Sequence, residues 1–353
     1  MAARKKAAPK NGASRKRRIL ALMHESLVPP DEAPAETVKA AEWKTEYHVV
    51  STLRALGHEV RPLGIGGDLG VLRAAVEEFQ PHIAFNLLEG FDDVPGWDAN
   101  VIGYLELLKV PYTGCNSRGL LLARDKSLTK KVLSYHRVPV ADFAVFPRNR
   151  RIQRRSKLKF PLIVKSLTLD ASIGISEASV VDDDAKLVER IRFIHESIGT
   201  DALVERYIEG RELYVGVLGN QRLQALPVWE LYFRELPEDK RNIATERLKW
   251  SLAYQKKHGI DSGAAQDLAP EVMARIQESC KRVYRNLLLS GYARIDLRLD
   301  ASGQAYVIEA NPNPQVSPDE DFARSAQAAG TDFGALLDKI VTLGLSWEPT
   351  RWG

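Results

Sequence analysis

The first third of the chain alternates short apolar runs with stretches of helical periodicity. The apolar runs predict strands at 17–26, 59–65, 82–90 and 111–115. The periodic stretches predict helices at 43–56, 71–80 and 99–110. Strands that alternate with helices indicate a parallel sheet with helical crossovers. We therefore expect a first α/β unit that ends near Asn116.

Beyond Asn116 the pattern changes to pairs of strands that follow one another closely. Such pairs are expected at 160–180 and 201–219, and a hairpin is expected at 293–311 with its turn at Asp300–Gly303. The remaining expected elements are helices at 123–137, 182–198, 270–289 and 333–343, strands at 143–146 and 223–233, and polar loops at 148–159 and 236–263. The fold class is therefore expected to be α/β, with an α+β arrangement in the C-terminal part.

The composition is that of an ordinary globular protein, with 44% hydrophobic and 27% charged residues over 353 positions. This length suits about two or three domains. No apolar run is long enough to span a membrane, and the N-terminus lacks the apolar core of a secretory signal. Cys115 and Cys280 lie far apart and match no metal spacing, which is typical of inert thiols in a reducing compartment. We therefore expect a cytoplasmic protein without a membrane partner.

The formal net charge of +4 is unevenly distributed along the chain. Residues 1–18 contain eight Lys or Arg and no acid, which leaves 42 basic and 46 acidic residues in the rest. A net-negative body argues against a folded nucleic-acid binder that relies on positive charge. The tail at 1–17 is interpreted as a basic, disordered extension. Contact of this tail with nucleic acid or another acidic surface is the alternative.

The end of the last expected strand, "VIEANPNP", carries candidate metal chemistry. Glu309 falls where its neighbours are apolar, and Asn311 follows two residues on, so both side chains point to the same face of a strand. Asp296 lies on the neighbouring strand of the expected hairpin. Two carboxylates and an amide oxygen suit Mg²⁺, and buried acids need a cation or another partner. The alternatives are a solvent-exposed strand end and ion pairs with Arg294 or Arg298.

Two lysines and two connecting segments add the parts of a nucleotide site. Lys165 ends the apolar strand "PLIVK", and Lys126 stands near the start of a helix. A lysine is a point charge suited to phosphate, although each of these can also be a solvated side chain. The loop "SLTLDASIG" offers backbone N–H groups to phosphates. The turn "VERYIEGRE" offers backbone groups to adenine and Glu212 to ribose hydroxyls.

Taken in order, these motifs resemble the D-alanine–D-alanine ligase family of ATP-grasp enzymes over about 18–345. The resemblance is carried by "VPYTG", "ARDKSLTKKVL", "PLIVKS", "VERYIEGRELYVGVLG", "ARIDLRL" and "VIEANPNP". It implies an ATP-grasp fold with an N-terminal Rossmann-like pre-ATP-grasp domain at 18–118. A central subdomain at 119–206 and a C-terminal subdomain with the metal and substrate site at 207–347 would follow.

The resemblance also implies roles for individual residues. Lys126 and Lys165 would contact the phosphates of ATP. The residues implied for adenine are Glu205, Arg206, Tyr207 and Ile208, and the residue implied for ribose is Glu212. The residues implied to hold two Mg²⁺ ions, for which Mn²⁺ can substitute, are Asp296, Glu309 and Asn311. Arg294 would stabilise a tetrahedral intermediate.

The implied function is that of an ADP-forming ligase, which joins a small-molecule carboxylate to an amine through an acyl phosphate. In such chemistry cations stabilise the developing charge, and the protein supplies no nucleophile. The alternative is a nucleotide-binding regulatory protein of the same fold without ligase activity. We also allow for a homodimer.

The segments with which the family contacts its amino acids differ here. The first strand is followed by "MHESLVPPDEA", where Glu25 is the expected substitute for a catalytic glutamate of the family. Ala171 interrupts the serine-rich loop, while Ser172 is retained as an expected catalytic residue. After "NPNP", Asp319 and Glu320 stand where the family contacts the substrate carboxylate. We therefore expect a substrate pair other than two D-alanines, with an acceptor of extra positive charge such as a basic amino acid or a diamine.

Overall fold

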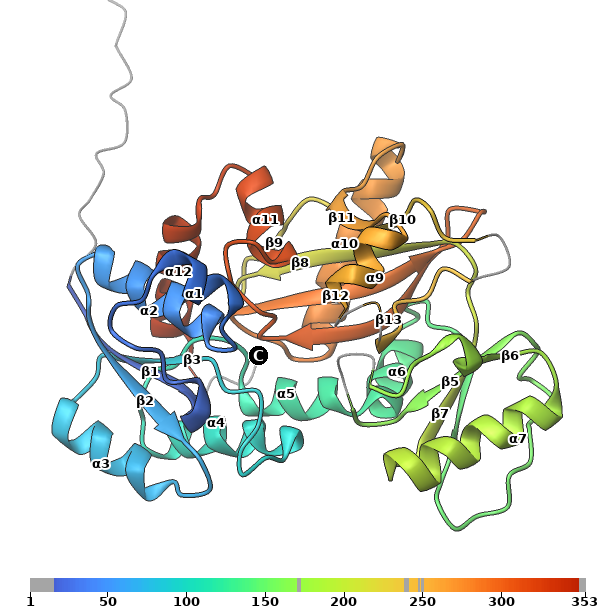
Figure 1. The fold of residues 1–353 in the computed structure, drawn as a ribbon, viewed down its shortest axis with the longest axis horizontal. Helices are drawn as coiled ribbons and strands as arrows, with labels where there is room; N and C mark the ends of the chain where they lie inside the picture. Colours follow the sequence, from blue (N-terminus) through green and yellow to red (C-terminus); the bar gives the residue numbers. More distant parts are fainter. Residues whose placement is uncertain (1–15, 170–172, 238–240, 247, 249–250, 349–353) are drawn as a thin grey trace, which may run out of the picture.

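The computed structural model describes residues 16–169, 173–237, 241–246, 248 and 251–348 (Figure 1). Its first layer is a parallel sheet in the order β2-β1-β3, formed by β1 (Arg18–His24), β2 (Glu59–Ile65) and β3 (Ile83–Asn86). The expected strand at 111–115 is reduced to one bridge between Tyr112 and Ala84. The parallel order and its helical crossovers confirm the expected α/β unit.

Helices from both ends of the chain pack around this first sheet. Those from the N-terminal part are α1 (Ala35–Ala40), α2 (Lys44–Ala55), α3 (Gly70–Phe79) and α4 (Asp98–Leu107), with 3-10 turns at Glu25–Leu27 and Pro95–Trp97. The last helix, α12 (Phe333–Leu345), packs on the same face as α2, and its Leu337 and Ile340 share one core cluster with Ile19 of β1. The contacts of α12 therefore cross the expected boundary between the first and last units.

The expected helix at 123–137 is two helices, α5 (Ser117–Arg124) and α6 (Lys126–Tyr135). Asp125 separates them because its backbone is extended, and its carboxylate accepts hydrogen bonds from the backbone N–H groups of Ser127 and Leu128. An aspartate in this position is a helix N-cap. The single-helix prediction was wrong, and the break places Lys126 in the first turn of α6.

A separate antiparallel sheet forms the central part of the molecule. Its order is β4-β7-β5-β6, from β4 (Phe143–Phe146), β5 (Leu162–Ser166), β6 (Val180–Val181) and β7 (Ala202–Arg206). A 3-10 turn at Glu177–Ser179 precedes β6, and α7 (Asp184–Phe193) ends in a π-helical turn at Ile194–Ile198. The apolar side chains of α7 pack on β5 and β7 in a core cluster of their own.

The C-terminal sheet is antiparallel throughout and has the order β11-β10-β8-β12-β13, with β9 paired to β8. Its strands are β8 (Arg211–Leu218), β9 (Gln224–Ala225), β10 (Trp229–Phe233), β11 (Ile260–Ala264), β12 (Tyr292–Leu299) and β13 (Ala305–Pro312). Its helices are α9 (Leu252–Lys257), α10 (Pro270–Asn286) and α11 (Asp321–Ala328). The expected polar loop at 236–263 thus contains α9 and most of β11, and α11 was not expected.

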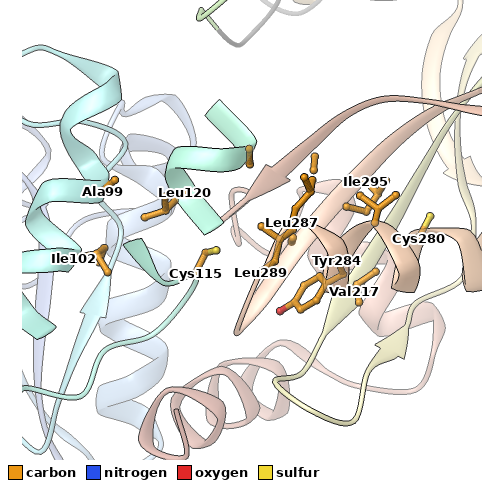
Figure 2. Packing of buried hydrophobic residues seen from close by; sticks show 14 of the residues in the cluster. Ala99, Ile102, Cys115, Leu120, Val217, Cys280, Tyr284, Leu287, Leu289 and Ile295 are labelled. Carbon is orange, nitrogen blue, oxygen red and sulfur yellow. The ribbon is translucent and has the colours of Figure 1, made fainter. Parts of the chain in front are cut away.

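The strand–turn–strand segment at 201–219 connects two different sheets, because β7 belongs to the central sheet and β8 to the C-terminal one. The largest core cluster, in contrast, joins the first unit to the C-terminal sheet, as Figure 2 shows for Leu120 and Cys115 on one side and Leu289 and Ile295 on the other. Burial raises the pKa of the Cys115 thiol to about 12, as befits an inert cysteine. Within the described residues, no helix combines the length and apolar character that crossing a membrane requires.

Candidate active site

The strand pair β12 and β13 places the expected metal ligands side by side. Asp296 lies directly opposite Glu309, and Arg294 lies opposite Asn311. Nδ2 of Asn311 donates to Oδ2 of Asp296 at 2.9 Å and to Oε1 of Glu309 at 3.3 Å. Two carboxylates and an amide therefore meet at one point. This donor set matches the oxygen ligands that Mg²⁺ prefers.

A β-bulge in β13 explains how Glu309 reaches this point from an apolar strand. Asp296 pairs with Glu309, but Leu297 pairs with Val307, so Ile308 is the extra residue of the bulge. Val307 is 2% exposed and belongs to the core. In a regular strand without a bulge, Val307 and Glu309 would lie on the same face because they are two residues apart. Because of the bulge, Val307 points into the core and Glu309 lines the cleft.

Arg294 also lies at this point, where it forms a bidentate ion pair with Asp296. Its Nε and Nη2 atoms donate to the two carboxylate oxygens at 2.7 and 2.9 Å. Burial alone would lower the pKa of Arg294, but the Asp296 carboxylate outweighs this effect and raises it. The arginine pairing that was an alternative to a metal is therefore present at Asp296. Among the described residues no group of three or more His, Cys, Asp or Glu is placed to hold a metal, so a cation here needs the Asn311 amide as a third ligand.

The two expected phosphate lysines are buried in one pocket. Lys126 is 4% exposed and Lys165 is 6% exposed, which contradicts the alternative that they are solvated. Nζ of Lys126 donates to the Leu169 carbonyl at 2.9 Å and lies 3.8 Å from Oε2 of Glu309. Nζ of Lys165 lies 2.6 Å from Oε2 of Glu205. Both cations thus line the space next to the metal candidates.

A third buried cation, Lys130, was missed by the sequence analysis. It is 1% exposed, its Nζ lies 2.6 Å from Oε1 of Glu205, and it donates to the Ile308 carbonyl in the bulge at 3.1 Å. Burial alone would raise the pKa of Glu205, but the ammonium groups of Lys130 and Lys165 outweigh it and lower the pKa. The available signal was its spacing, since Lys130 follows Lys126 by one helical turn and so shares its face of the helix.

The segment between β7 and β8 is fixed by another buried arginine, Arg298. Its guanidinium donates to the Ile208 carbonyl at 3.0 Å, to the Tyr207 hydroxyl at 2.9 Å and to Oε2 of Glu212 at 3.1 Å. These three residues line the pocket of Lys126 and Lys165. Arg298 was considered as a partner of the metal acids, and the structure places it here instead.

The nucleotide pocket, as we name this space, collects most of the expected site residues. It is lined by Lys126, Lys165, Glu205, Arg206, Tyr207, Ile208, Glu212, Asp296 and Glu309. A cleft of about 700 Å³ lies next to it and is lined by Arg294, Glu309 and Asn311. Glu309 therefore stands where the nucleotide pocket and the cleft meet.

The structure does not bring Glu25 to the cleft. This residue lies in the turn after β1, is exposed, and has its carboxylate against the backbone of Gly66. Two acids of the first unit line the cleft, Glu89 after β3 and Asp98 at the start of α4, and neither was predicted. Ala171 and Ser172 lie outside the described residues.

The segment after β13 is anchored to the first unit by Asn313. Its Oδ1 accepts a hydrogen bond from the Cys115 backbone N–H at 2.7 Å. A Cβ atom on Gly114 would lie 2.3 Å from this oxygen, and Gly114 has a φ of +91°. Only glycine fits this approach, so "VPYTG" and "NPNP" meet in space.

The two acids that follow, Asp319 and Glu320, have different surroundings. Asp319 is ion-paired with Lys44 of α2 and accepts from the Ser317 hydroxyl at 2.9 Å. Lys44 offsets the charge of Asp319, which also lines the cleft, so the expected repulsion of a substrate carboxylate stays a prediction. Glu320 lines the cleft, and burial raises its pKa.

Comparison with known proteins places this geometry in a family. Residues 132–342 match the family model described as D-ala D-ala ligase C-terminus. A D-alanine–D-alanine ligase of Desulfotalea psychrophila is 32% identical over 289 residues, covering 80% of this chain and 84% of that protein. An uncharacterised protein of Sinorhizobium fredii, y4sG, is 32% identical over 301 residues, covering 83% and 85%.

A solved structure shares the fold. The D-alanine–D-alanine ligase of Bacillus anthracis complexed with ATP superposes with a TM-score of 0.71 at 23% identity, covering 93% of this chain and 97% of that one. The expected ATP-grasp fold is thereby confirmed.

Proposed function

The chain belongs to the D-alanine–D-alanine ligase family, and from this premise we propose that its cleft joins a carboxylate to an amine other than the D-alanine pair. It is an ATP-dependent carboxylate–amine ligase that forms ADP, in a family that uses ATP and Mg²⁺. The observation that carries the site assignment is the position of Glu309, which lines both the nucleotide pocket and the cleft. Phosphoryl transfer between two such spaces requires charge neutralisation where they meet.

The reaction consists of two transfers. First, a carboxylate oxygen of one substrate takes the γ-phosphoryl group of ATP, ADP leaves, and an acyl phosphate forms. Second, the amine nitrogen of the other substrate attacks the acyl carbon, loses a proton and forms the C–N bond, while phosphate leaves with the C–O electron pair. In our proposal Arg294 stabilises the oxyanion of the tetrahedral intermediate, because it is a fixed cation on the cleft side of Glu309.

The nucleotide pocket orients ATP in this proposal. Lys126 and Lys165 contact phosphate oxygens, while Tyr207 and Ile208 frame the adenine and Glu212 holds the ribose. Arg298 supports this arrangement because it fixes the backbone of the segment and the Glu212 carboxylate at once.

Glu205 and Arg206 line the same pocket. Because the two oxygens of Glu205 are held by Lys130 and Lys165, its role in the proposal is to position these lysines.

Asp296, Glu309 and Asn311 would hold Mg²⁺, as two ions in our proposal and with Mn²⁺ as a substitute. A bound ion neutralises the charge that develops on the transferred phosphoryl group. Glu25 has no part in this proposal because it lies away from the cleft. Ser172 keeps its expected catalytic role as a prediction.

The experiment is a substrate screen. Amino acids and small peptides, singly and in pairs, are incubated with ATP and Mg²⁺, phosphate release is followed, and products are identified by mass spectrometry. We expect at least one pair to stimulate phosphate release and to give a product that has lost one water, whereas D-alanine alone gives little dipeptide. Efficient, saturable D-alanyl-D-alanine formation contradicts the altered-substrate proposal. Failure of every pair contradicts the ligase proposal.

The alternative of a nucleotide-binding regulator without ligase activity has no observation in its favour, since the site retains Arg294 beside the metal candidates. The domain boundaries at 18–118, 119–206 and 207–347, the cytoplasmic location and the homodimer stay predictions. So does the interpretation of the basic tail, which lies mostly outside the described residues.

A further inference from the structure

A second cavity, of about 290 Å³, opens at the carboxyl ends of β1 and β3. Its walls come from His24 at the end of β1, from 87–90 after β3, from the start of α2 and from 313–316. Ligands of parallel α/β sheets bind at this edge. Glu89 lines both this cavity and the cleft of Arg294, as does the segment 313–315. The two spaces are therefore neighbours with a shared wall.

The walls of this cavity, which we name the acidic pocket, carry an excess of negative charge. Its lining residues, all within the described ranges, include the carboxylates of Glu42, Glu46, Glu89 and Asp93 and no lysine or arginine. The imidazole of His24 lies 3.4 Å from Asp93, whose side chain is 94% exposed. Cations in solution are attracted to a concave surface of this kind.

Glu46 is the informative member of the acidic pocket. It is 5% exposed, and its Oε2 atom has no hydrogen-bond partner. A buried carboxylate oxygen without a hydrogen-bond partner is costly, and a protein under selection for stability alone would place an apolar side chain here. Burial, helped by the charge of Glu89, raises the pKa of Glu46 to about 7. Glu46 thus has an acceptor oxygen inside a cavity where the fold does not use it.

The sequence favoured two acids, Asp319 and Glu320, for a cationic substrate. Asp319 already pairs with Lys44, whereas Glu320 lines the cleft, where burial raises its pKa. The Oε2 atom of Glu46 lies in the acidic pocket, which shares residues 313–315 with the cleft. Residue Glu46 of α2 is therefore a buried acceptor for a cation in addition to the acids near the end of the chain.

We propose that the acidic pocket binds the side-chain ammonium of a basic substrate, a diamine or a diamino acid, whose reacting group lies in the neighbouring cleft. A primary ammonium donates three hydrogen bonds, so it can satisfy Oε2 of Glu46 together with a second acceptor of the pocket. This inference rests on the proposed ligase function, of which it specifies the substrate class.

The test compares two amino acids that differ only in the side-chain ammonium. Ornithine and norvaline, in both enantiomers, are titrated into the full chain by calorimetry with ADP and Mg²⁺ at pH 6.5. Each titration is repeated in two buffers of different ionisation enthalpy, which reports protons released on binding. The variants are Glu46→Gln and, as a matched control on the exposed face of α1, Glu36→Gln.

We expect one enantiomer of ornithine to bind at least about tenfold more tightly than norvaline, as one ion pair of modest strength provides. Binding should release most of one proton, because a cation beside Glu46 favours its ionised form. Glu46→Gln should abolish the proton release and weaken ornithine binding about tenfold, with norvaline unchanged. Glu36→Gln should behave as wild type.

Equal binding of ornithine and norvaline to the wild type overturns the proposal without any variant, and so does proton release that persists in Glu46→Gln. The two proposals fail separately. If ornithine binds as expected but no amine or amino-acid pair gives ADP, the ligase proposal is contradicted and the acidic-pocket proposal is supported. If neutral pairs give ADP and ornithine binds no more tightly than norvaline, the acidic-pocket proposal is contradicted and the ligase proposal is supported.

Discussion

The nucleotide pocket and the acidic pocket differ in how far their buried carboxylates are paired. In the nucleotide pocket Glu205 is shared by Lys130 and Lys165, and Glu212 is paired with Arg298. In the acidic pocket Glu46 keeps an oxygen without a partner. The first arrangement is complete before any ligand arrives, so it suits a nucleotide common to a whole family. The second is incomplete, so it suits the part of the reaction in which family members differ.

The largest effect is expected at the junction of the nucleotide pocket and the cleft. Glu309→Gln should lower turnover by about 10³ or more, in the range seen when one electrostatic contact to a transition state is removed. The fold should be retained, because glutamine keeps the shape and the bond to Asn311. Phosphate release and circular dichroism provide the measurement, and Glu271→Gln on the exposed side of α10 is the control. Turnover near that of wild type would remove Glu309 from the site.

Replacing Lys130 removes one of the two lysines that pair with Glu205 in the nucleotide pocket. Lys130→Met leaves Glu205 with one ammonium instead of two, and we expect the free energy of unfolding to fall by about 3 kcal/mol, the order found when a buried ion pair loses a member. Urea unfolding measures this change. Adding Glu205→Gln to Lys130→Met should lower the stability further, because it leaves the buried Lys165 without its carboxylate partner. If the double variant is more stable than the single one, the charge balance assigned to this pocket is wrong.

Smaller effects are expected for the lysines that face the nucleotide. Lys126→Ala and Lys165→Ala should each raise the KM for ATP about tenfold to a hundredfold, as expected for a lost hydrogen bond to a charged group. Initial rates over a range of ATP concentrations give the values. Lys131→Ala, on the exposed side of α6, serves as the control. Unchanged ATP kinetics in both variants would show that ATP binds elsewhere.

The last effect sharpens the comparison from the side of the acidic pocket. The pKa of Glu46 is raised from 4.5 to about 7, so between these values the folded state binds more protons than the unfolded state. Stability therefore decreases as pH rises through this window and levels off above it, by up to about 3 kcal/mol for this one group. The charged or titratable groups that line the pocket with it are His24, Glu42, Glu89, Asp93 and Tyr292.

Urea unfolding at pH 5 and pH 8 isolates this contribution when wild type is compared with Glu46→Gln. The variant lacks the titrating group, so its stability should fall less over this interval. An identical pH dependence in the two proteins would mean that Glu46 is ionised throughout.

The ordered motifs predicted which charged residues come together, and the structure brings them to one pocket although they stand on two different sheets and a helix. Lys126, Lys165 and Glu309 meet as the hairpin and the helix start suggested. The bulge at Ile308 was not predictable from periodicity, since a single extra residue reverses the faces that a regular strand assigns. Lys130 escaped notice because a lysine on an amphipathic helix is usually solvated.

Glu46 shows a second reason for missing a residue. Its local sequence, "EWKTEYHVV", is that of an ordinary surface helix start, whereas the pocket that it lines is formed partly by residues 313–316, which are distant in the sequence. Local sequence patterns cannot predict a pocket wall that is formed by a segment distant in the sequence. The same limit explains α12, whose packing on β1 depends on a contact between the two ends of the chain.

The packing of α12 on the first sheet has a consequence for the synthesis of the protein on the ribosome. The strands β1 and β3 are made well before residues 333–345, which cover one of their faces. Until α12 is made, that apolar face lacks its cover, and exposed faces of this kind promote aggregation and chaperone binding. The first sheet is thus translated long before its packing is complete.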